Sequence, residues 1–279
     1  MRLRNSYFSI ALVILIGLVT TAAATADGEF RVCADPNNLP LSNSAEAGFE
    51  NKLAAMVAED LGKQVQYTWW AQRRGFIRNT LKAGKCDVVM GVPSGYDLVE
   101  ATKPYYRSTY VFVTRQDRRL DLSSLLDSRL RHLVIGVHLI GDDGTNPPPA
   151  QALGEQGIVD NVRGYSIYGD YREADPPARL IEAVENGEID IAAAWGPLGG
   201  YFAQRSAVPL TVTPIRDYER FAPQQFRFAI SMGVRKGDRA LRDRLNAFID
   251  AHRSEITSLL RNYGVPLVDM PVTVSGGHK

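Results

Sequence analysis

The chain has 279 residues, of which 45% are hydrophobic and 23% charged, with 32 Lys and Arg against 31 Asp and Glu. This balance leaves no excess of basic residues for the broad positive surface that nucleic-acid binding needs. The length suits one large domain or two of roughly 100–150 residues each, and the hydrophobic content is sufficient for a sizeable core.

The N-terminus has the pattern of a secretory leader. Arg2 and Arg4 precede an apolar run over residues 10–19, and Ala24 and Ala26 fit the small-residue rule for cleavage. We therefore predict a signal peptide over residues 1–26 and export to the periplasm. An uncleaved anchor is the alternative, but the run is short for a span of about 20 residues. Cleavage leaves 30 basic against 31 acidic residues, so no stable membrane insertion and no strong charge are expected.

The first predicted elements alternate between strand and helix. One face of the first helix is apolar, through Phe49, Leu53 and Val57, and Gly62 ends it. The order predicts a parallel sheet with helices on both faces. In chain order the elements are a strand over 30–34, a helix over 48–61, a strand over 65–70, a short helix over 76–82 and a strand over 86–92.

A second stretch repeats this order with a strand over 133–137, a helix over 177–185 and a strand over 189–194. Residues 81–89 match 184–192 in their pattern of helix end, Gly, Asp and apolar strand. A Gly- and Pro-containing turn is expected after each final strand. The match is short, but it favours two similar α/β lobes.

Two extended segments, 108–114 and 226–234, are expected to cross between the lobes, and two helices then follow up to Gly264. The predicted fold is thus a two-lobed α/β binding-protein fold, in which each lobe is a parallel-rich sheet flanked by helices. We assign residues 27–112 and 226–265 to lobe 1, residues 113–225 to lobe 2 and residues 266–279 to a C-terminal tail.

Cys33 and Cys86 are the only two cysteines. An even count in an exported protein favours a disulfide, and the two residues fall on strands one and three, which are neighbours in the usual doubly wound order. Two buried free thiols are the alternative.

No motif for catalysis or metal binding stands out. His132, His138, His252 and His278 are not paired at metal-ligand spacing, and there is no phosphate-binding Gly loop or nucleophile elbow. Each His is interpreted as a surface or packing residue, so we expect no metal site.

The candidate binding residues lie at the predicted carboxyl ends of strands, where open α/β sheets bind ligands. Aromatic rings with a few polar groups are typical of a small-molecule cleft. The candidates are Asp35, Asn37, Asn38, Trp70, Pro93, Asp142, Asp143, Trp195 and Gly196, with Tyr105, Tyr106 and Arg107 just before the first crossing.

Each candidate also has a structural interpretation. Asp35 is equally consistent with a turn cap, Asp142 and Asp143 with a solvated loop, and Trp70 and Trp195 with packing. Three further features are interpreted as structural: Trp69 as core, Asp87 and Asp190 as residues that hold backbone in place, and Arg73 with Arg74 as a solvated pair.

Four segments together resemble type 2 periplasmic solute-binding proteins of family 3, and among them the MxaJ/XoxJ proteins found beside pyrroloquinoline-quinone (PQQ) methanol dehydrogenases. The likeness spans nearly all of residues 27–265, and residues 102–113 resemble the approach to the hinge of such proteins. The segments are 33–40, 48–52, 86–93 and 194–203.

The resemblance implies a periplasmic accessory protein that aids the maturation or activation of a PQQ-dependent dehydrogenase. Such a protein would have no catalytic activity of its own, and PQQ would be bound by the partner dehydrogenase. Amino-acid receptors of this fold place an Arg where this chain has Gly95, so the usual carboxylate clamp is missing. Two alternatives stay open: an importer receptor for a small organic ligand that is not a common amino acid, and a dehydratase-like enzyme.

Overall fold

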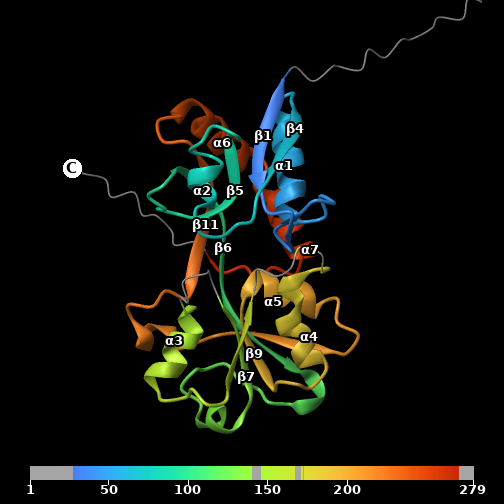
Figure 1. The fold of residues 1–279 in the computed structure, drawn as a ribbon, viewed down its shortest axis with the longest axis vertical. Helices are drawn as coiled ribbons and strands as arrows, with labels where there is room; N and C mark the ends of the chain where they lie inside the picture. Colours follow the sequence, from blue (N-terminus) through green and yellow to red (C-terminus); the bar gives the residue numbers. More distant parts are fainter. Residues whose placement is uncertain (1–27, 140–145, 167–170, 172, 270–279) are drawn as a thin grey trace, which may run out of the picture.

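The computed structural model describes residues 28–139, 146–166, 171 and 173–269. Figure 1 shows two lobes, one above the other, with one long strand running between them. The predicted leader and the candidates Asp142 and Asp143 lie outside the described residues.

Lobe 1 contains a sheet in the order β4-β1-β5-β11-β6. β1 is parallel to β4 and β5, so their carboxyl ends meet at one edge, whereas β11 is antiparallel to both of its neighbours. The elements of this lobe are β1 (Glu29–Ala34), β2 (Asn37–Asn38), β3 (Ser42–Asn43), α1 (Phe49–Asp60), β4 (Gln64–Trp69), α2 (Phe76–Asn79), β5 (Val88–Pro93), β11 (Arg227–Val234), α6 (Arg239–Ala251) and α7 (Arg253–Asn262).

The connection between the lobes is β6 (Glu100–Arg115), a single strand that belongs to both. Its first part pairs with β11, up to Thr109, and from Tyr110 onward it pairs with β9 and β10. The predicted crossing over 108–114 lies within β6, as does the predicted lobe boundary at 112/113. One continuous sheet therefore passes through both lobes.

Lobe 2 repeats the parallel arrangement, because β7 is parallel to both β8 and β9. Its elements are β7 (Ile135–Leu139), α3 (Pro148–Glu155), β8 (Val162–Ser166), α4 (Arg179–Glu185), β9 (Ile191–Trp195), α5 (Gly196–Ala203) and β10 (Leu210–Pro214). Short 3₁₀ helices lie at Gln116–Arg118, Ser128–His132, Pro176–Ala178 and Tyr218–Phe221.

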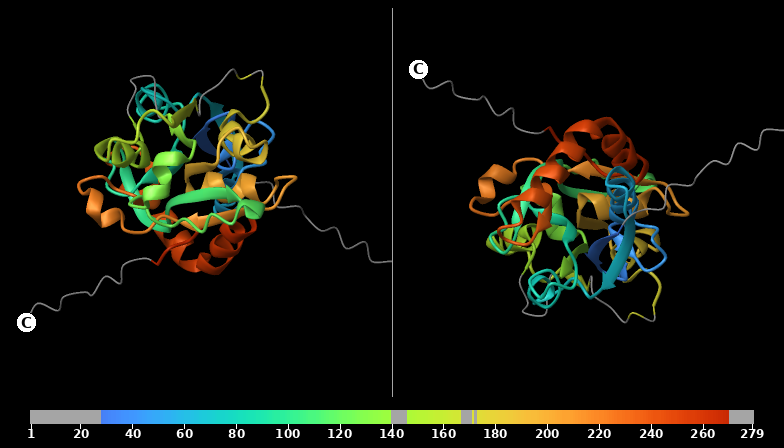
Figure 2. Two further views of the ribbon diagram at one scale, coloured as in Figure 1. Left: turned by 90° about the horizontal axis from the view of Figure 1, so that it is seen from below. Right: turned by 90° about the horizontal axis from the view of Figure 1, so that it is seen from above.

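The two faces of the lobe 1 sheet are covered unequally. α1, α6 and α7 contribute residues such as Leu53, Phe248 and Leu260 to one large core. The other face carries a smaller cluster under α2, with Phe76, Leu81 and the two cysteines. Figure 2 shows α6 and α7 on the opposite side of the molecule from α2. The α2 face is therefore the thinly covered one.

The predicted disulfide between Cys33 and Cys86 is confirmed, with 5.5 Å between their Cα atoms. β1 and β5 run parallel as neighbours, and Val32 is paired with Val88. That register brings the two cysteines together beneath α2, where both are buried.

Three predictions differ from the structure. The helix predicted over 76–82 ends at Asn79, because the Thr80 backbone leaves helical geometry. The turn expected at 196–200 is instead α5, since Pro197 fits the first turn of a helix. The predicted tail begins with residues that pack: Leu267 bridges to Ser108, whose hydroxyl donates to the Pro266 carbonyl at 2.6 Å.

Candidate functional site

The principal cavity has a volume of about 1200 Å³ and lies on the thinly covered side of lobe 1. One wall is the segment around α2, from Gln72 to Lys82, and the opposite wall comes from β5 and β11. The cavity reaches lobe 2 at Trp195 and Leu198, where β9 meets α5. It therefore includes surfaces from both lobes and from the strands that join them.

Residues of the sheet line the cavity beside α2, which is only one turn long. Phe228 and Ile230 of β11 and Val92 of β5 line it. At its mouth, Leu98 is 53% exposed and Tyr96 is 36% exposed. Large apolar side chains on the surface next to a hollow are typical of a binding site.

Trp195 is the candidate residue most closely tied to the connection between the lobes. It ends β9 opposite Tyr110 of β6, and its ring makes edge contacts with Tyr110 at 5.4 Å and Phe228 at 5.6 Å between centroids. The ring is half-buried and lines the cavity. Packing and cleft exposure, which the sequence left as alternatives, thus coexist in this residue.

The turn after β5 explains why no Arg stands at the usual clamp position. Gly95 has a φ of +82°, and Tyr96 N–H donates to the Pro93 carbonyl at 3.1 Å. A side chain at that position would be strained, since the left-handed region favours Gly. In the same turn, Ser94 Oγ lies 2.7 Å from Ser231 Oγ on β11, within hydrogen-bond distance. Pro93 itself lines the cavity.

Asp35 is a turn cap and a contact between the lobes. It is 1% exposed; Oδ1 accepts from Asn37 N–H at 2.8 Å and Oδ2 from Gln72 N–H at 2.6 Å. Tyr171 of lobe 2 also donates its hydroxyl to Oδ2, at 3.3 Å. Burial raises the pKa of Asp35, and the two backbone hydrogen bonds oppose that rise.

Asn37 and Asn38 lie on opposite sides of this contact. Asn37 Nδ2 donates to the Glu173 carbonyl of lobe 2 at 2.7 Å, and Asn37 lines a second, smaller cavity of about 400 Å³ together with Tyr171 and Asp175. Asn38 instead lines the principal cavity. The loop after β1 therefore joins the lobes at one edge of the principal cavity.

Tyr105 and Tyr106 do not line the cavity, contrary to the prediction. Both belong to the lobe 1 core, at 6% and 4% exposure, and burial raises the pKa of each well above the usual range. A register shift between β11 and β6 lies at this point, where Ile230 pairs with Tyr106 and Ser231 with Pro104. This irregularity interrupts the usual alternation of side chains and lets two consecutive residues be buried.

Three other candidates also lie away from the cavity. Arg107 is half-buried, and its Nη1 donates to the Asp269 carbonyl at 3.4 Å. Trp70 is 40% exposed, with Lys85 Nζ 4.8 Å above its ring. Gly196 is buried against β6, and a Cβ there would lie 2.4 Å from the Thr109 carbonyl oxygen. Its role is close packing of α5 on the strand that joins the lobes.

The basic residues around α2 have a position that the sequence did not show. Arg73 and Arg74 are exposed, as expected of a solvated pair, but they also line the cavity, together with Arg78 and Lys82. The high density of basic residues between β4 and β5 was the sequence feature that could have indicated a binding surface here. Their periodicity alone could not show that the facing wall is apolar.

Glu50 was also missed. It lies in the first turn of α1, where an acid is ordinary because it favours the helix dipole. In the structure it is buried behind β5, so close to Gly91 that any Cβ there would overlap its carboxylate. Burial raises its pKa from 4.5 to about 8.

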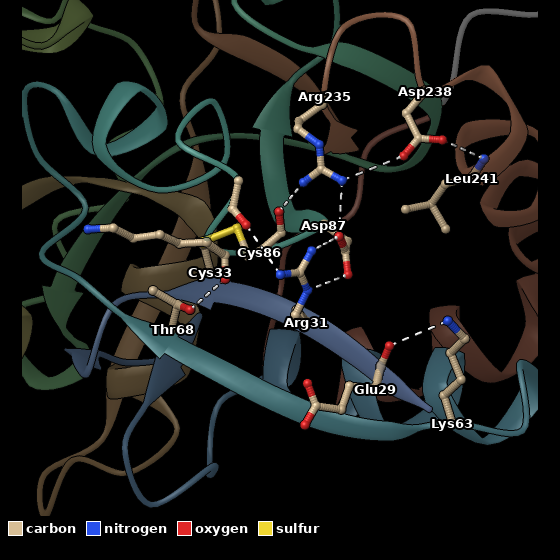
Figure 3. A network of polar contacts seen from close by, with 12 residues as sticks. Glu29, Arg31, Cys33, Lys63, Thr68, Cys86, Asp87, Arg235, Asp238 and Leu241 are labelled. Atoms are coloured by element: carbon tan, nitrogen blue, oxygen red, sulfur yellow. Dashed lines mark hydrogen bonds and ion pairs between the residues drawn. A yellow bond between two sulfur atoms is a disulfide. The ribbon is translucent and has the colours of Figure 1, made fainter. Parts of the chain in front are cut away.

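Asp87 is held by two arginines, through which it is linked to the backbone carbonyls of Gly84 and Cys86 (Figure 3). Arg31 donates to it from Nε at 3.1 Å and Nη2 at 2.6 Å, and Arg235 donates from Nη2 at 3.0 Å. Burial raises the pKa of Asp87, but these arginines outweigh burial and lower it. In lobe 2, Asp190 accepts from Val134 N–H at 2.8 Å, as predicted for a backbone contact.

The described residues include no group of three or more His, Cys, Asp or Glu that could hold a metal ion. His138 is buried beside the Pro177 carbonyl, and burial lowers its pKa to about 4. Over the same part of the chain, no helix has the length and apolar character required to cross a membrane.

Comparison with known proteins gives a consistent result. The chain is 33% identical over 256 residues to protein MoxJ of Methylorubrum extorquens, covering 88% of this chain and 84% of that protein, and 27% identical to protein MoxJ of Paracoccus denitrificans, covering 90% and 94%. The crystal structure of the periplasmic binding protein XoxJ from Methylobacterium extorquens AM1 superposes with a TM-score of 0.71 at 35% identity, covering 86% of this chain and all of that one.

These matches agree with the two-lobed α/β fold and with the resemblance of the four sequence segments. The model of the family described as bacterial extracellular solute-binding proteins, family 3, matches residues 30–265. That range includes both lobes, β6 and every cavity residue named above. The chain therefore belongs to the family 3 extracellular solute-binding proteins.

Proposed function

We propose that this protein is a periplasmic accessory protein of a PQQ-dependent methanol or alcohol dehydrogenase, and that it aids the maturation or activation of that enzyme. The observation that carries the proposal is its likeness to MoxJ and XoxJ along nearly the whole chain. Proteins of the type that the four segments resemble are found beside such dehydrogenases. The departure at Gly95 from the amino-acid clamp also favours a role other than amino-acid uptake.

The mouth of the cavity is the proposed contact surface. Among the aromatic binding candidates from the sequence, Tyr105 and Tyr106 are buried in the core and Trp195 is half-buried. Leu98 and Tyr96 are exposed at the same mouth and take their place. Apolar and aromatic side chains at the centre of an interface contribute most of the binding energy.

We further propose that the chain catalyses no reaction and that PQQ is held by the partner. A dehydratase-like enzyme would need a free general acid in the cleft. Asp35 is committed to two backbone donors and to Tyr171, and His138 is buried against a carbonyl. Neither group is placed to exchange a proton with a ligand.

The test is deletion of the gene, followed by measurement of PQQ-dependent alcohol oxidation in the periplasm. Complementation with the wild-type gene should restore activity, and the dehydrogenase should co-purify with the tagged protein. Leu98→Ser should weaken both the restored alcohol oxidation and the co-purification of the dehydrogenase. Val159→Ser is the matched control, because Val159 is 61% exposed and lies outside the cavity. Unchanged oxidation in the deletion strain, without co-purification, would reject the proposal.

A second function, as receptor for an importer, is favoured by one observation: the cavity is large enough for a small organic ligand. It predicts loss of uptake of that solute in the deletion strain with normal alcohol oxidation. The two readouts separate the functions.

A further inference from the structure

Among the described residues that line the principal cavity, every charged one is cationic. Its lining includes six cationic residues, and none of the described residues that line it is acidic. Asp97 lies next to Tyr96 at the mouth but does not line the cavity. The cationic residues are Arg73, Arg74, Arg78, Lys82, Arg235 and Lys236.

Most of these cations are not neutralised by the protein. Arg235 is engaged by Asp87 and Asp238. For the other five, the described part of the chain contains no ion pair with an acid. Arg73 interacts electrostatically with the buried Asp35 carboxylate, so its charge is partly compensated. Cations without an ion-paired acid beside the cavity raise the local potential and favour an anion.

The opposite wall requires the ligand to have an apolar body. Phe228 and Trp195 line the cavity and are half-buried, and Leu98 and Tyr96 are exposed at its mouth. A hydrated inorganic ion would leave these surfaces unsatisfied, whereas an organic anion can bury its body against them and keep its charge at the arginines. Arg is well suited to this task, because its planar fork pairs with carboxylates in a bidentate manner.

The same charges argue against an α-amino acid. Among the described lining residues its ammonium group would meet cations and no acid, and its carboxylate would lack the clamp that Gly95 replaces. The volume of about 1200 Å³ also exceeds the roughly 300–1000 Å³ that is common for small-ligand sites. A ligand whose apolar body contains more than one ring, or a chain of the same length, fits such a space.

We propose that this cavity binds an organic polycarboxylate with an extended apolar or aromatic body, through the arginines of the α2 segment and the apolar wall of β11. This goes beyond the accessory role and does not depend on it. A binding experiment on the purified chain tests the site without any dehydrogenase.

The probe is biphenyl-4,4′-dicarboxylate, titrated into residues 27–279 by isothermal calorimetry. We expect measurable binding that weakens as salt increases. The uncharged diamide of the same skeleton should bind at least tenfold more weakly. Arg73→Gln and Arg78→Gln should each weaken the dicarboxylate several-fold, whereas Arg244→Gln, an exposed control on α6, should not. Because all three side chains are exposed, these variants should keep the fold, which thermal unfolding checks.

Several results would overturn the proposal: equal affinity for the dicarboxylate and the diamide, equal effects of Arg78→Gln and Arg244→Gln, or no binding at millimolar dicarboxylate. Binding of glycine or leucine with similar affinity would also contradict it. A second titration, with an acidic, apolar peptide, tests whether the cavity binds a protein segment instead. If an acidic, apolar peptide binds while the dicarboxylate does not, the cavity is a docking groove for a protein segment.

Discussion

Tyr171 of lobe 2 donates its hydroxyl to Asp35 Oδ2 of lobe 1, with 3.3 Å between the oxygens. The same carboxylate accepts a backbone N–H on each of its oxygens. One buried acid thus holds the loop after β1, the segment before α2 and the facing loop of lobe 2. These three segments meet at the edge of the principal cavity.

Asp35→Asn should therefore be more damaging than Tyr171→Phe. The amide has a single acceptor oxygen, so one backbone N–H would face an NH₂ group, and we expect a loss of about 1–3 kcal/mol in the free energy of unfolding. Tyr171→Phe removes one hydrogen bond to Asp35, which keeps its two backbone hydrogen bonds. The expected loss in the free energy of unfolding is about 0.5–1.5 kcal/mol. Urea denaturation measures both, with Tyr165→Phe as the control. Equal losses would contradict the assignment of Asp35 as a double cap.

Glu50 should make the stability depend on pH. Its pKa is about 8 in the folded chain and 4.5 ordinarily, so the folded state holds more protons between these values. The stabilisation is fully present below pH 4.5 and is lost as pH rises to about 8, with a slope of at most about 1.4 kcal/mol per pH unit.

The measurement is the free energy of unfolding at several pH values for wild type, Glu50→Gln and Glu59→Gln. The neutral amide at position 50 should flatten the profile. Glu59 is exposed on the same helix, so its substitution should leave the slope unchanged. A Glu50→Gln profile as steep as that of the wild type would show that another group is responsible.

Asp87 should contribute more to stability than a surface acid. Its removal in Asp87→Asn leaves Arg31 and Arg235 without their shared charged partner, and we expect a loss of about 1–3 kcal/mol. Asp250→Asn breaks a contact with Lys103 in which both side chains are at least half exposed, which is worth about 0–1 kcal/mol. Chemical denaturation compares them, and a larger effect at Asp250 would refute this ranking.

Reduction of the disulfide should lower the stability of lobe 1. Cys33 and Cys86 are separated by 53 positions in the sequence, and the chain-entropy model assigns such a loop about 4 kcal/mol. The double variant Cys33→Ser/Cys86→Ser should therefore melt well below the oxidised wild type in thermal unfolding. It should match reduced wild type, and a large difference between these two would indicate that serine itself disturbs the site.

Local sequence was sufficient for much of the fold. Apolar periodicity located α1, β5, β9 and the helices after Asp238, and the parallel order of the first strands placed Cys33 beside Cys86. It also identified Asn38, Pro93 and Trp195, which do line the cavity. These properties follow from side-chain patterns over a few residues, which backbone geometry converts directly into faces and edges.

The burial of Tyr105 and Tyr106 and the position of Arg73 and Arg74 were decided only by tertiary structure. A register shift against β11 turns the tyrosines into the core, and no local pattern signals that shift. The arginines border a cavity that is also lined by Phe228 and Ile230 of β11, so their significance depends on a strand far later in the chain. Burial and charge at a site depend on distant segments, and those are brought together by packing of the whole chain.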